Sequence, residues 1–238
     1  MNDTVDRDGG APVSDLVRLK RLPHKGHYDF ESMCQVLDAG CLCHVGYMLD
    51  GVPVVTPTIY WREGEHVYWH GSAASRMLKT AAKMPVCISV AHLDGFVMAR
   101  CAFDHSVHYR SVMLFGEAER IDDPEHKVAS FRYFIENLFP GRWGMLRPLK
   151  ALEAEATSLL RLRIQEGAAK LSNIEPRDLD DGSQPCWAGI IPVRMTVGTP
   201  VPAANLPPDM EMPDHVRHFD VTRPQRHAAG VTKVPEKV

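Results

Sequence analysis

Short stretches in which apolar and polar residues alternate dominate the chain between about residue 41 and residue 120. Alternation with a period of two is typical of strands that bury one face. The Asp-Gly pairs at 50–51 and 94–95 predict tight hairpin turns between such strands. We expect strands at 41–48, 52–61, 66–70, 85–92, 96–103, 111–120, 159–165 and 190–197. This pattern predicts a mainly β fold, a barrel or a sandwich of antiparallel strands with a few accessory helices.

Apolar residues spaced three and four positions apart predict the helices. The clearest case begins at Pro124, a residue that suits the first helical position, and carries Val128, Phe131, Ile135 and Leu138 on one face. The helices are expected at 29–38, 72–83, 123 to about 138, and 148 to about 157.

The two ends of the chain lack either periodicity. Residues 1–17 are mostly polar, and residues 199–238 are rich in proline. We therefore predict a flexible N-terminal segment at 1–17, one domain at 18–198, and a proline-rich C-terminal tail at 199–238. That tail either lies on the domain or on a partner subunit, or is disordered.

Composition narrows the class of protein. The chain has 238 residues, 45% of them hydrophobic, and a formal charge of −3. This is enough apolar material for a core, and the charge argues against a nucleic-acid binder that works by bulk charge. No stretch approaches about 18 uninterrupted apolar residues, and the first residues do not resemble a signal peptide. We expect a cytoplasmic protein with neither nucleic acid nor membrane as a partner.

Histidines and cysteines are the residues of this chain that could serve as metal ligands. The six cysteines lie mostly among apolar neighbours and are expected to be reduced, buried thiols. The groupings Cys41-Leu-Cys-His44, His24 with His27, and His105 with His108 each lack the further ligands that a metal site needs. No metal site is predicted.

The helix expected after residue 71 places hydroxyls and cations on one face. Ser72, Ser75, Arg76 and Lys79 follow each other at the spacing i, i+3, i+4 and i+7. An arginine and a lysine near a helix N-terminus suit a phosphate monoester, because both charge and backbone N–H groups attract it. The alternative is an ordinary solvated face that happens to be basic.

A proline interrupts the strand expected before that helix. Pro57 lies between Thr56 and Thr58 and cannot donate a hydrogen bond to a neighbouring strand, which predicts an edge or a bulge. Such an edge leaves backbone groups free to bind a heterocycle, or the proline merely protects the edge from unwanted pairing.

A series of short motifs, spread over roughly residues 18–195, resembles one family. The chain is similar to the FMN-binding split-barrel proteins related to pyridoxamine 5′-phosphate oxidase, and within them to the branch of the nitroimidazole-resistance proteins. The motifs are Arg21-Leu-Pro, Tyr28-Asp29, Leu37-Asp-Ala-Gly40, Cys43-His-Val-Gly46, Asp50-Gly-Val-Pro53, Thr56-Pro-Thr58, Tyr68-Trp-His-Gly-Ser72, Arg76 to Lys79, Tyr109-Arg-Ser-Val112, Phe115-Gly-Glu-Ala118 and Trp187-Ala-Gly-Ile-Ile-Pro192.

The resemblance implies an antiparallel split β-barrel, the pyridoxamine-phosphate-oxidase-like FMN-binding fold, assembled as a homodimer with two FMN sites at its interface. It also implies roles for twelve residues. The flavin ring edge would be lined by Val55, Thr56, Pro57 and Thr58; the ribityl chain and phosphate would be held by His70, Ser72, Ser75, Arg76 and Lys79; Arg110 and Ser111 would approach from either subunit; and Trp187 would pack near the ring or ribityl chain.

The resemblance further implies an FMN-dependent oxidoreductase that acts on a small molecule, with NAD(P)H as a transient donor. His70 would either transfer a proton as a catalytic residue or only hold the cofactor. The sequence leaves three other functions to compare. A flavin carrier without turnover stays open; a pyridoxamine 5′-phosphate oxidase is disfavoured because no Arg-x-His-Asp-Arg pattern follows Ile191; and a domain that has lost its cofactor is disfavoured by Arg76 and Lys79.

Overall fold

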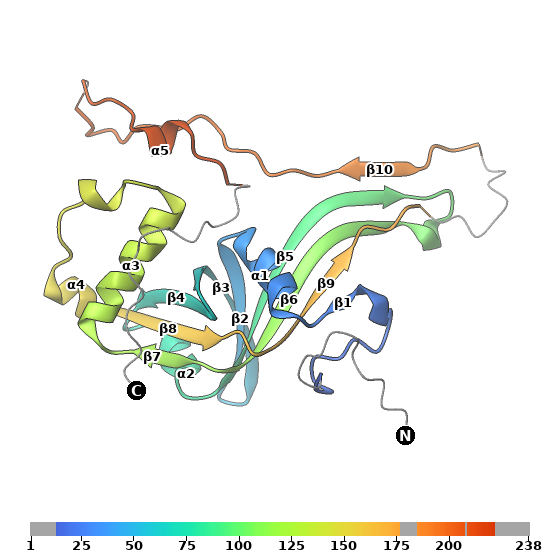
Figure 1. Ribbon diagram of the computed structural model, residues 1–238, viewed down its shortest axis with the longest axis horizontal. Coiled ribbons are helices and arrows are strands. Elements are labelled where there is room, and N and C mark those ends of the chain that lie inside the picture. Colours follow the sequence, from blue (N-terminus) through green and yellow to red (C-terminus); the bar gives the residue numbers. More distant parts are fainter. Residues whose placement is uncertain (1–12, 177–184, 208, 222–238) are drawn as a thin grey trace.

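The structure, a computed structural model, describes residues 13–176, 185–207 and 209–221 (Figure 1). The first twelve residues of the expected N-terminal segment and the last part of the expected tail, 222–238, lie outside the described residues. None of the helices within these ranges is long and apolar enough to cross a membrane.

The architecture is one antiparallel sheet of ten strands in the order β1-β9-β6-β5-β2-β3-β4-β8-β7, with β10 paired to β5. This confirms the predicted mainly β, split-barrel fold class. The strands are β1 (Gly26–His27), β2 (Leu42–Leu49), β3 (Val52–Glu63), β4 (His66–Ser72), β5 (Pro85–Met98), β6 (Ser106–Glu117), β7 (Glu119–Ile121), β8 (Thr157–Arg163), β9 (Glu166–Ser172) and β10 (Gly189–Pro192).

The hairpin predicted at Asp94-Gly95 is wrong, because β5 runs straight through it. The register against β6 shifts between Leu93 and Gly95, so the pair forms a bulge rather than a turn. The Asp94 carboxylate accepts two hydrogen bonds from Arg110 on β6, which ties the bulge to its neighbour. A side chain at position 95 would meet the Ile191 carbonyl oxygen at 2.9 Å, so only glycine allows β10 to lie this close.

The helices are α1 (Phe30–Asp38), α2 (Arg76–Ala81), α3 (Pro124–Leu138), α4 (Ala151–Glu155) and α5 (Asp214–Arg217). Short 3-10 turns occur at η1 (Pro23–Lys25), η2 (Ala102–Asp104) and η3 (Trp143–Met145). α2 is shorter than the helix expected at 72–83, because Gly71 and Ser72 still pair with β8. In α3 the predicted Phe131, Ile135 and Leu138 pack against the smaller apolar cluster beside the buried Phe134, whereas Val128 is exposed.

Two apolar clusters form on opposite faces of β3 and β4. Tyr60 and Trp69 are a cross-strand pair that belongs to the larger cluster, together with residues of α1 and α2. Trp61 and Tyr68, the next pair, point the other way into a smaller cluster that α3 covers with Phe134. Because adjacent residues of a strand face opposite sides, these four aromatic residues hold a helix on each face of the sheet.

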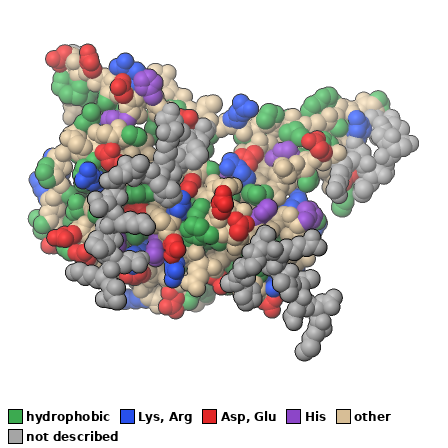
Figure 2. All heavy atoms as spheres, in the orientation of Figure 1, with side chains coloured by type: hydrophobic (Ala, Val, Ile, Leu, Met, Phe, Trp, Pro, Cys, Tyr) green, Lys and Arg blue, Asp and Glu red, His purple; other side chains and the backbone are tan. Residues whose placement is uncertain are grey.

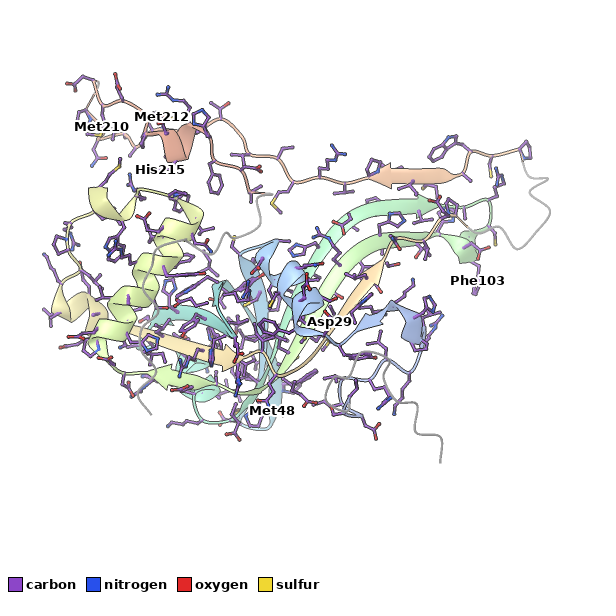
Figure 3. The ribbon with its side chains drawn as sticks, viewed as in Figure 1. Asp29, Met48, Phe103, Met210, Met212 and His215 are labelled. Atoms are coloured by element: carbon purple, nitrogen blue, oxygen red, sulfur yellow. The ribbon has the colours of Figure 1, made fainter. Side chains whose placement is uncertain are left out.

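The C-terminal segment returns along the length of the molecule. After β10 the chain runs back above the sheet to α5, which lies near the end of α3 (Figure 1). The Phe139 ring lies 5.3 Å from that of Phe219 and 6.5 Å from that of His215, between ring centroids. Figure 3 shows His215 on the same segment as Met210 and Met212. The part of the expected tail around α5 therefore contacts the domain at the end of α3.

Candidate functional site

The first half of β3 is an open edge. Val52 to Ile59 pair with β2, whereas β4 pairs only with Tyr60 to Glu63. Within the described residues, no strand pairs with the other side of positions 52–59. This confirms the edge that Pro57 predicts, and it leaves backbone N–H and C=O groups free for a ligand.

The four residues expected along the flavin ring alternate across this edge. Val55 and Pro57 lie on the outer face of the sheet, opposite Gly46 and His44. Thr56 lies on the inner face, where its Oγ1 is 3.4 Å from the Tyr47 hydroxyl, and Thr58 faces the same way. The side chains of these four residues therefore do not form one surface. A ligand along this edge would meet their backbone groups instead.

The predicted phosphate residues meet at α2. Ser75 occupies the N-cap position without a side-chain capping bond, and the Ser72 hydroxyl accepts a hydrogen bond from the Ala74 N–H. Arg76 and Lys79 are exposed. The part of the chain that the structure describes offers neither of them a carboxylate partner. α2 is only six residues long, so its N-terminus alone is not an anion site. The attraction for an anion here comes from the unpaired side-chain charges of Arg76 and Lys79.

His70 faces the opposite side of β4 from the residues of α2 that pack on the larger cluster. Its ring lies 5.3 Å from Phe131, 5.7 Å from Trp61 and 6.0 Å from Phe134, between ring centroids. We call these three rings and His70 the His70 cluster. The His70 Nδ1 atom is buried without a hydrogen-bond partner among the described residues. The structure thus groups His70 with aromatic rings under α3 rather than with the cations of α2.

Burial lowers the pKa of His70, so its imidazole is neutral at neutral pH. A neutral imidazole keeps one nitrogen lone pair available to a metal ion or to a proton donor. An unpartnered buried nitrogen among aromatic rings also costs free energy, which a ligand that bonds the imidazole would recover.

A half-buried carboxylate, that of Glu63, holds Trp61 in the His70 cluster. The indole Nε1 of Trp61 donates to Glu63 at 2.7 Å, and the Ser130 hydroxyl donates to the same oxygen. Burial raises the pKa of Glu63, and these two hydrogen bonds oppose the shift without cancelling it. The folded state therefore favours the protonated acid more than the unfolded chain does.

Glu63 should make the stability of the protein depend on pH. Its folded-state pKa is raised, so its contribution to stability is greatest below the unfolded pKa and is lost as pH rises through the folded value. We expect Glu63→Gln to lack the decrease in stability that ionisation of Glu63 causes as pH rises. Its Tm at pH 7 should be about 2–4 °C above that of the wild type, equivalent to about 1 kcal/mol.

Thermal unfolding of both proteins at several values between pH 4 and pH 8 measures this effect. Glu65→Gln, which removes an exposed carboxylate two residues away, is the control for loss of one negative charge. Parallel curves of Tm against pH for wild type and Glu63→Gln would contradict the assignment.

Three predicted residues lie on other strands. Arg110 is bonded to Asp94 on the inner face of the sheet, whereas Ser111 points to the outer face because it follows in the same strand. Trp187 is 66% exposed just before β10, beside Gly189. Their roles in a flavin site stay predictions.

A basic cleft beside α2 was missed by the sequence analysis. It has a volume of about 510 Å³ and contains four cations, Lys79, Lys83, Arg120 and Lys127. Lys83 lies seven positions after Arg76, so helical spacing could have included it. Arg120 and Lys127 come from β7 and α3. No local sequence pattern predicts that these two residues lie beside α2.

No group of three or more His, Cys, Asp or Glu residues that could hold a metal ion occurs in the described ranges. In the expected His105 and His108 pair, the ring nitrogens of each lie 2.9 Å and 2.7 Å from the carbonyl oxygens of Cys101 and Ile174. The six cysteines are free thiols, two of them buried, and Cys186 is exposed, unlike the expected buried majority.

Several hydrophobic side chains on the outer face of β2, β3, β5 and β6 are exposed in the single chain, beside polar residues such as His44 and Ser111. Its exposed members range from 44% to 64% accessible and are Leu42, Met48, Val55, Leu93 and Met113. Further hydrophobic side chains lie along the arm formed by β5, β6 and β10, visible at the right of Figure 2. Exposed hydrophobic side chains that gather on one face are typical of a protein–protein interface.

Comparisons with known proteins agree with this geometry. Residues 29–171 match the family described as pyridoxamine 5′-phosphate oxidase. The structure of the flavocytochrome Anf3 from Azotobacter vinelandii is similar at 43% identity and a TM-score of 0.84, over 88% of this chain and 99% of that one. The FAD and heme binding protein from Mycobacterium smegmatis is similar at 33% identity and a TM-score of 0.78, over 82% and 97%.

The expected kinship with the nitroimidazole-resistance branch receives no such support. A putative 5-nitroimidazole antibiotic resistance protein from Bacteroides thetaiotaomicron is only 18% identical, with a TM-score of 0.45 over 61% of this chain and 85% of that one. No curated protein matches the chain.

Proposed function

Because the chain belongs to the pyridoxamine 5′-phosphate oxidase family, we propose that it is a flavin-dependent oxidoreductase that also binds heme. The observation that carries the proposal is the likeness to the flavocytochrome, which spans nearly all of that protein and extends well beyond the family match at 29–171. The FAD and heme binding protein supports the same pair of cofactors independently. The substrate would be a small molecule, and NAD(P)H would be a transient electron donor.

The residues present fit a flavin. Arg76 and Lys79 are cations without a carboxylate partner among the described residues, and Ser75 adds a hydroxyl beside them, as a phosphate requires. The open edge at 55–58 offers backbone groups to the polar rim of a ring system. FMN and FAD share the ring, ribityl chain and first phosphate, so these residues serve the expected FMN and FAD equally. When bound, the flavin supplies hydride chemistry, while the protein binds and orients it.

The residues present also fit a heme. His70 offers a neutral imidazole, and its surroundings are the aromatic side chains of Trp61, Phe131 and Phe134, which suit an apolar macrocycle. We assign His70 as an iron ligand, a role that replaces the proton-transfer and ribityl-binding roles expected for it. When bound, a heme supplies one-electron transfer.

The proposed assembly is a homodimer. The outer face of β2, β3, β5 and β6, with its exposed hydrophobic side chains, is the surface that a second copy would cover, and Val55 on the flavin edge belongs to it. Ser111 also points to this face. Covering the face would exclude water from the flavin ring.

Size-exclusion chromatography with absorbance and light-scattering detection tests the proposal. We expect one peak at twice the chain mass that carries flavin bands and a heme Soret band, each cofactor near one per chain, and both reduced by NADPH under nitrogen. A colourless protein that binds neither added flavin nor heme would overturn the proposed function. A coloured protein that NADPH leaves oxidised would favour a carrier, and a monomer with bound flavin would contradict the shared site.

A further inference from the structure

Two cysteines flank the end of the ladder between β5 and β10. The antiparallel ladder ends with Gly189 opposite Met98, and each step forward on β5 is one step back on β10. Cys101 lies three residues beyond Met98, and Cys186 lies three residues before Gly189. The register of this ladder, continued past its last pair, therefore places the two cysteines opposite each other.

The hydrogen bonds of the ladder show which kind of pair the two cysteines would form. The Val193 N–H donates to the Asp94 carbonyl oxygen at 2.9 Å, so these opposite residues are a hydrogen-bonded pair. Pro192, which has no N–H to donate, occupies the non-hydrogen-bonded position that comes next. The two kinds of pair alternate along an antiparallel ladder. Cys101 and Cys186, an odd number of steps from the first pair, would therefore be a non-hydrogen-bonded pair.

Non-hydrogen-bonded pairs have a geometry that suits a disulfide bond. Their Cα atoms lie about 4.5 Å apart, and their side chains approach more closely than those of hydrogen-bonded pairs. A disulfide bond needs a Cα separation of about 4.4–6.8 Å. In the structure both cysteines are free thiols and the ladder ends at Gly189 and Met98. Closing the bond therefore requires the ladder to extend by three pairs in its existing register.

The surroundings of these two thiols differ from those of the other four. Cys186 is exposed, and Cys101 is half-buried at the end of the arm, two residues before Phe103, which is 84% exposed (Figure 3). Burial raises the pKa of the remaining thiols, which are those of Cys34, Cys41, Cys43 and Cys87. A thiol that stays protonated reacts slowly with oxidants, so oxidation should select the pair on the arm.

We propose that Cys101 and Cys186 are a redox-active pair that hydrogen peroxide converts to an intrachain disulfide bond, which fastens the start of β10 to the end of β5. One thiolate attacks a peroxide oxygen and the O–O bond breaks, which gives a sulfenic acid and hydroxide. The other thiol attacks the sulfenic sulfur, the S–S bond forms, and the sulfenic oxygen leaves as water. The hydroxide takes up the proton of the first thiol, so two thiols and one peroxide give one disulfide and two waters.

The bond would restrain a short strand. β10 has four residues and pairs with β5, and the chain runs from it back to α5 (Figure 1). A strand this short opens easily, because few hydrogen bonds hold it. The disulfide bond would add a covalent link next to Trp187, at the end of β10 where the ladder stops. The inference requires neither flavin nor heme, so it goes beyond the proposed function.

Oxidation of the reduced, purified protein with hydrogen peroxide at low protein concentration tests the proposal. Peptide mapping without reduction identifies the bonded cysteines. We expect the peptide that joins Cys101 to Cys186 to exceed every other cysteine pairing by at least about tenfold, and glutathione to restore both thiols. Hydrogen exchange of the β10 amides should slow by at least about fivefold in the oxidised protein.

Single substitutions provide the controls. Cys101→Ser and Cys186→Ser should each abolish the bond and make hydrogen exchange of β10 insensitive to peroxide. Cys87→Ser removes a half-buried thiol of β5 outside the pair, and this variant should form the bond as the wild type does.

Three outcomes would overturn the inference. Covalent dimers linked through Cys186 would show that this thiol reacts between chains rather than within one. Sulfinic acid at both cysteines without a bond would show that the fold keeps them apart. The same mixture of pairings in native and in denatured protein would show that the register does not select this pair. Because flavin and heme content enters none of these readouts, failure of the proposed function would leave the result unchanged.

Discussion

Arg76→Glu is expected to yield a folded protein that retains less than about a tenth of the wild-type flavin. The substitution removes a guanidinium from the proposed phosphate site and places a carboxylate against a dianion. Losing one partner of a charge pair at a binding site commonly costs about 2–5 kcal/mol, which corresponds to at least about 30-fold in affinity. Flavin absorbance per chain after desalting measures the effect.

The fold should not suffer, because Arg76 is exposed and donates to no carboxylate within the described ranges. Arg132→Glu, at an exposed position on α3, is the matched control and should keep its flavin. Normal flavin content in Arg76→Glu, with the wild-type circular dichroism spectrum, would rule out α2 as the phosphate site. The heme Soret band provides an internal comparison, because His70 lies on the other face of β4.

The sequence predicts the elements of this fold well where the signal is local. The alternation of apolar residues predicts most strands, and the Asp50-Gly51 turn is confirmed between β2 and β3, with both residues at positive φ. The same dipeptide at 94–95 misleads, because Asp-Gly suits a bulge as well as a turn. Which of the two forms depends on Arg110, sixteen residues away, and on the close approach of β10.

The candidate site likewise has a part that local sequence predicts and a part that depends on tertiary contacts. Ser75, Arg76 and Lys79 could be grouped from the sequence, because they are neighbours on one short helix. The cleft could not, because its cations come from α2, β7 and α3. The environment of His70 was also hidden: strand parity places it on the side of Tyr68, but nothing local shows that Phe131 and Phe134 of α3 cover that side.

His70→Ala is expected to remove the Soret band while leaving flavin content near the wild-type value. The variant loses the imidazole proposed as the iron ligand, and a heme held only by apolar contacts should fall below about a tenth of the wild-type amount in purified protein. The measurement is the pyridine hemochrome spectrum per chain, beside flavin released by heat. Because the alanine also leaves a cavity, His70→Gln, which restores most of the volume without an imidazole, should lose heme as well.

His126→Ala separates ligation from packing. His126 is another half-buried histidine of the same region, with its Nε2 atom 3.4 Å from the Tyr68 hydroxyl, and burial lowers its pKa as it does that of His70. Its loss should leave the heme in place, and added imidazole should restore a Soret band in His70→Ala by occupying the space left by the side chain. If His126→Ala loses heme and His70→Ala does not, the iron ligand is the histidine of α3. If neither does, the ligand lies outside the smaller cluster, and His70 regains its expected role near the flavin.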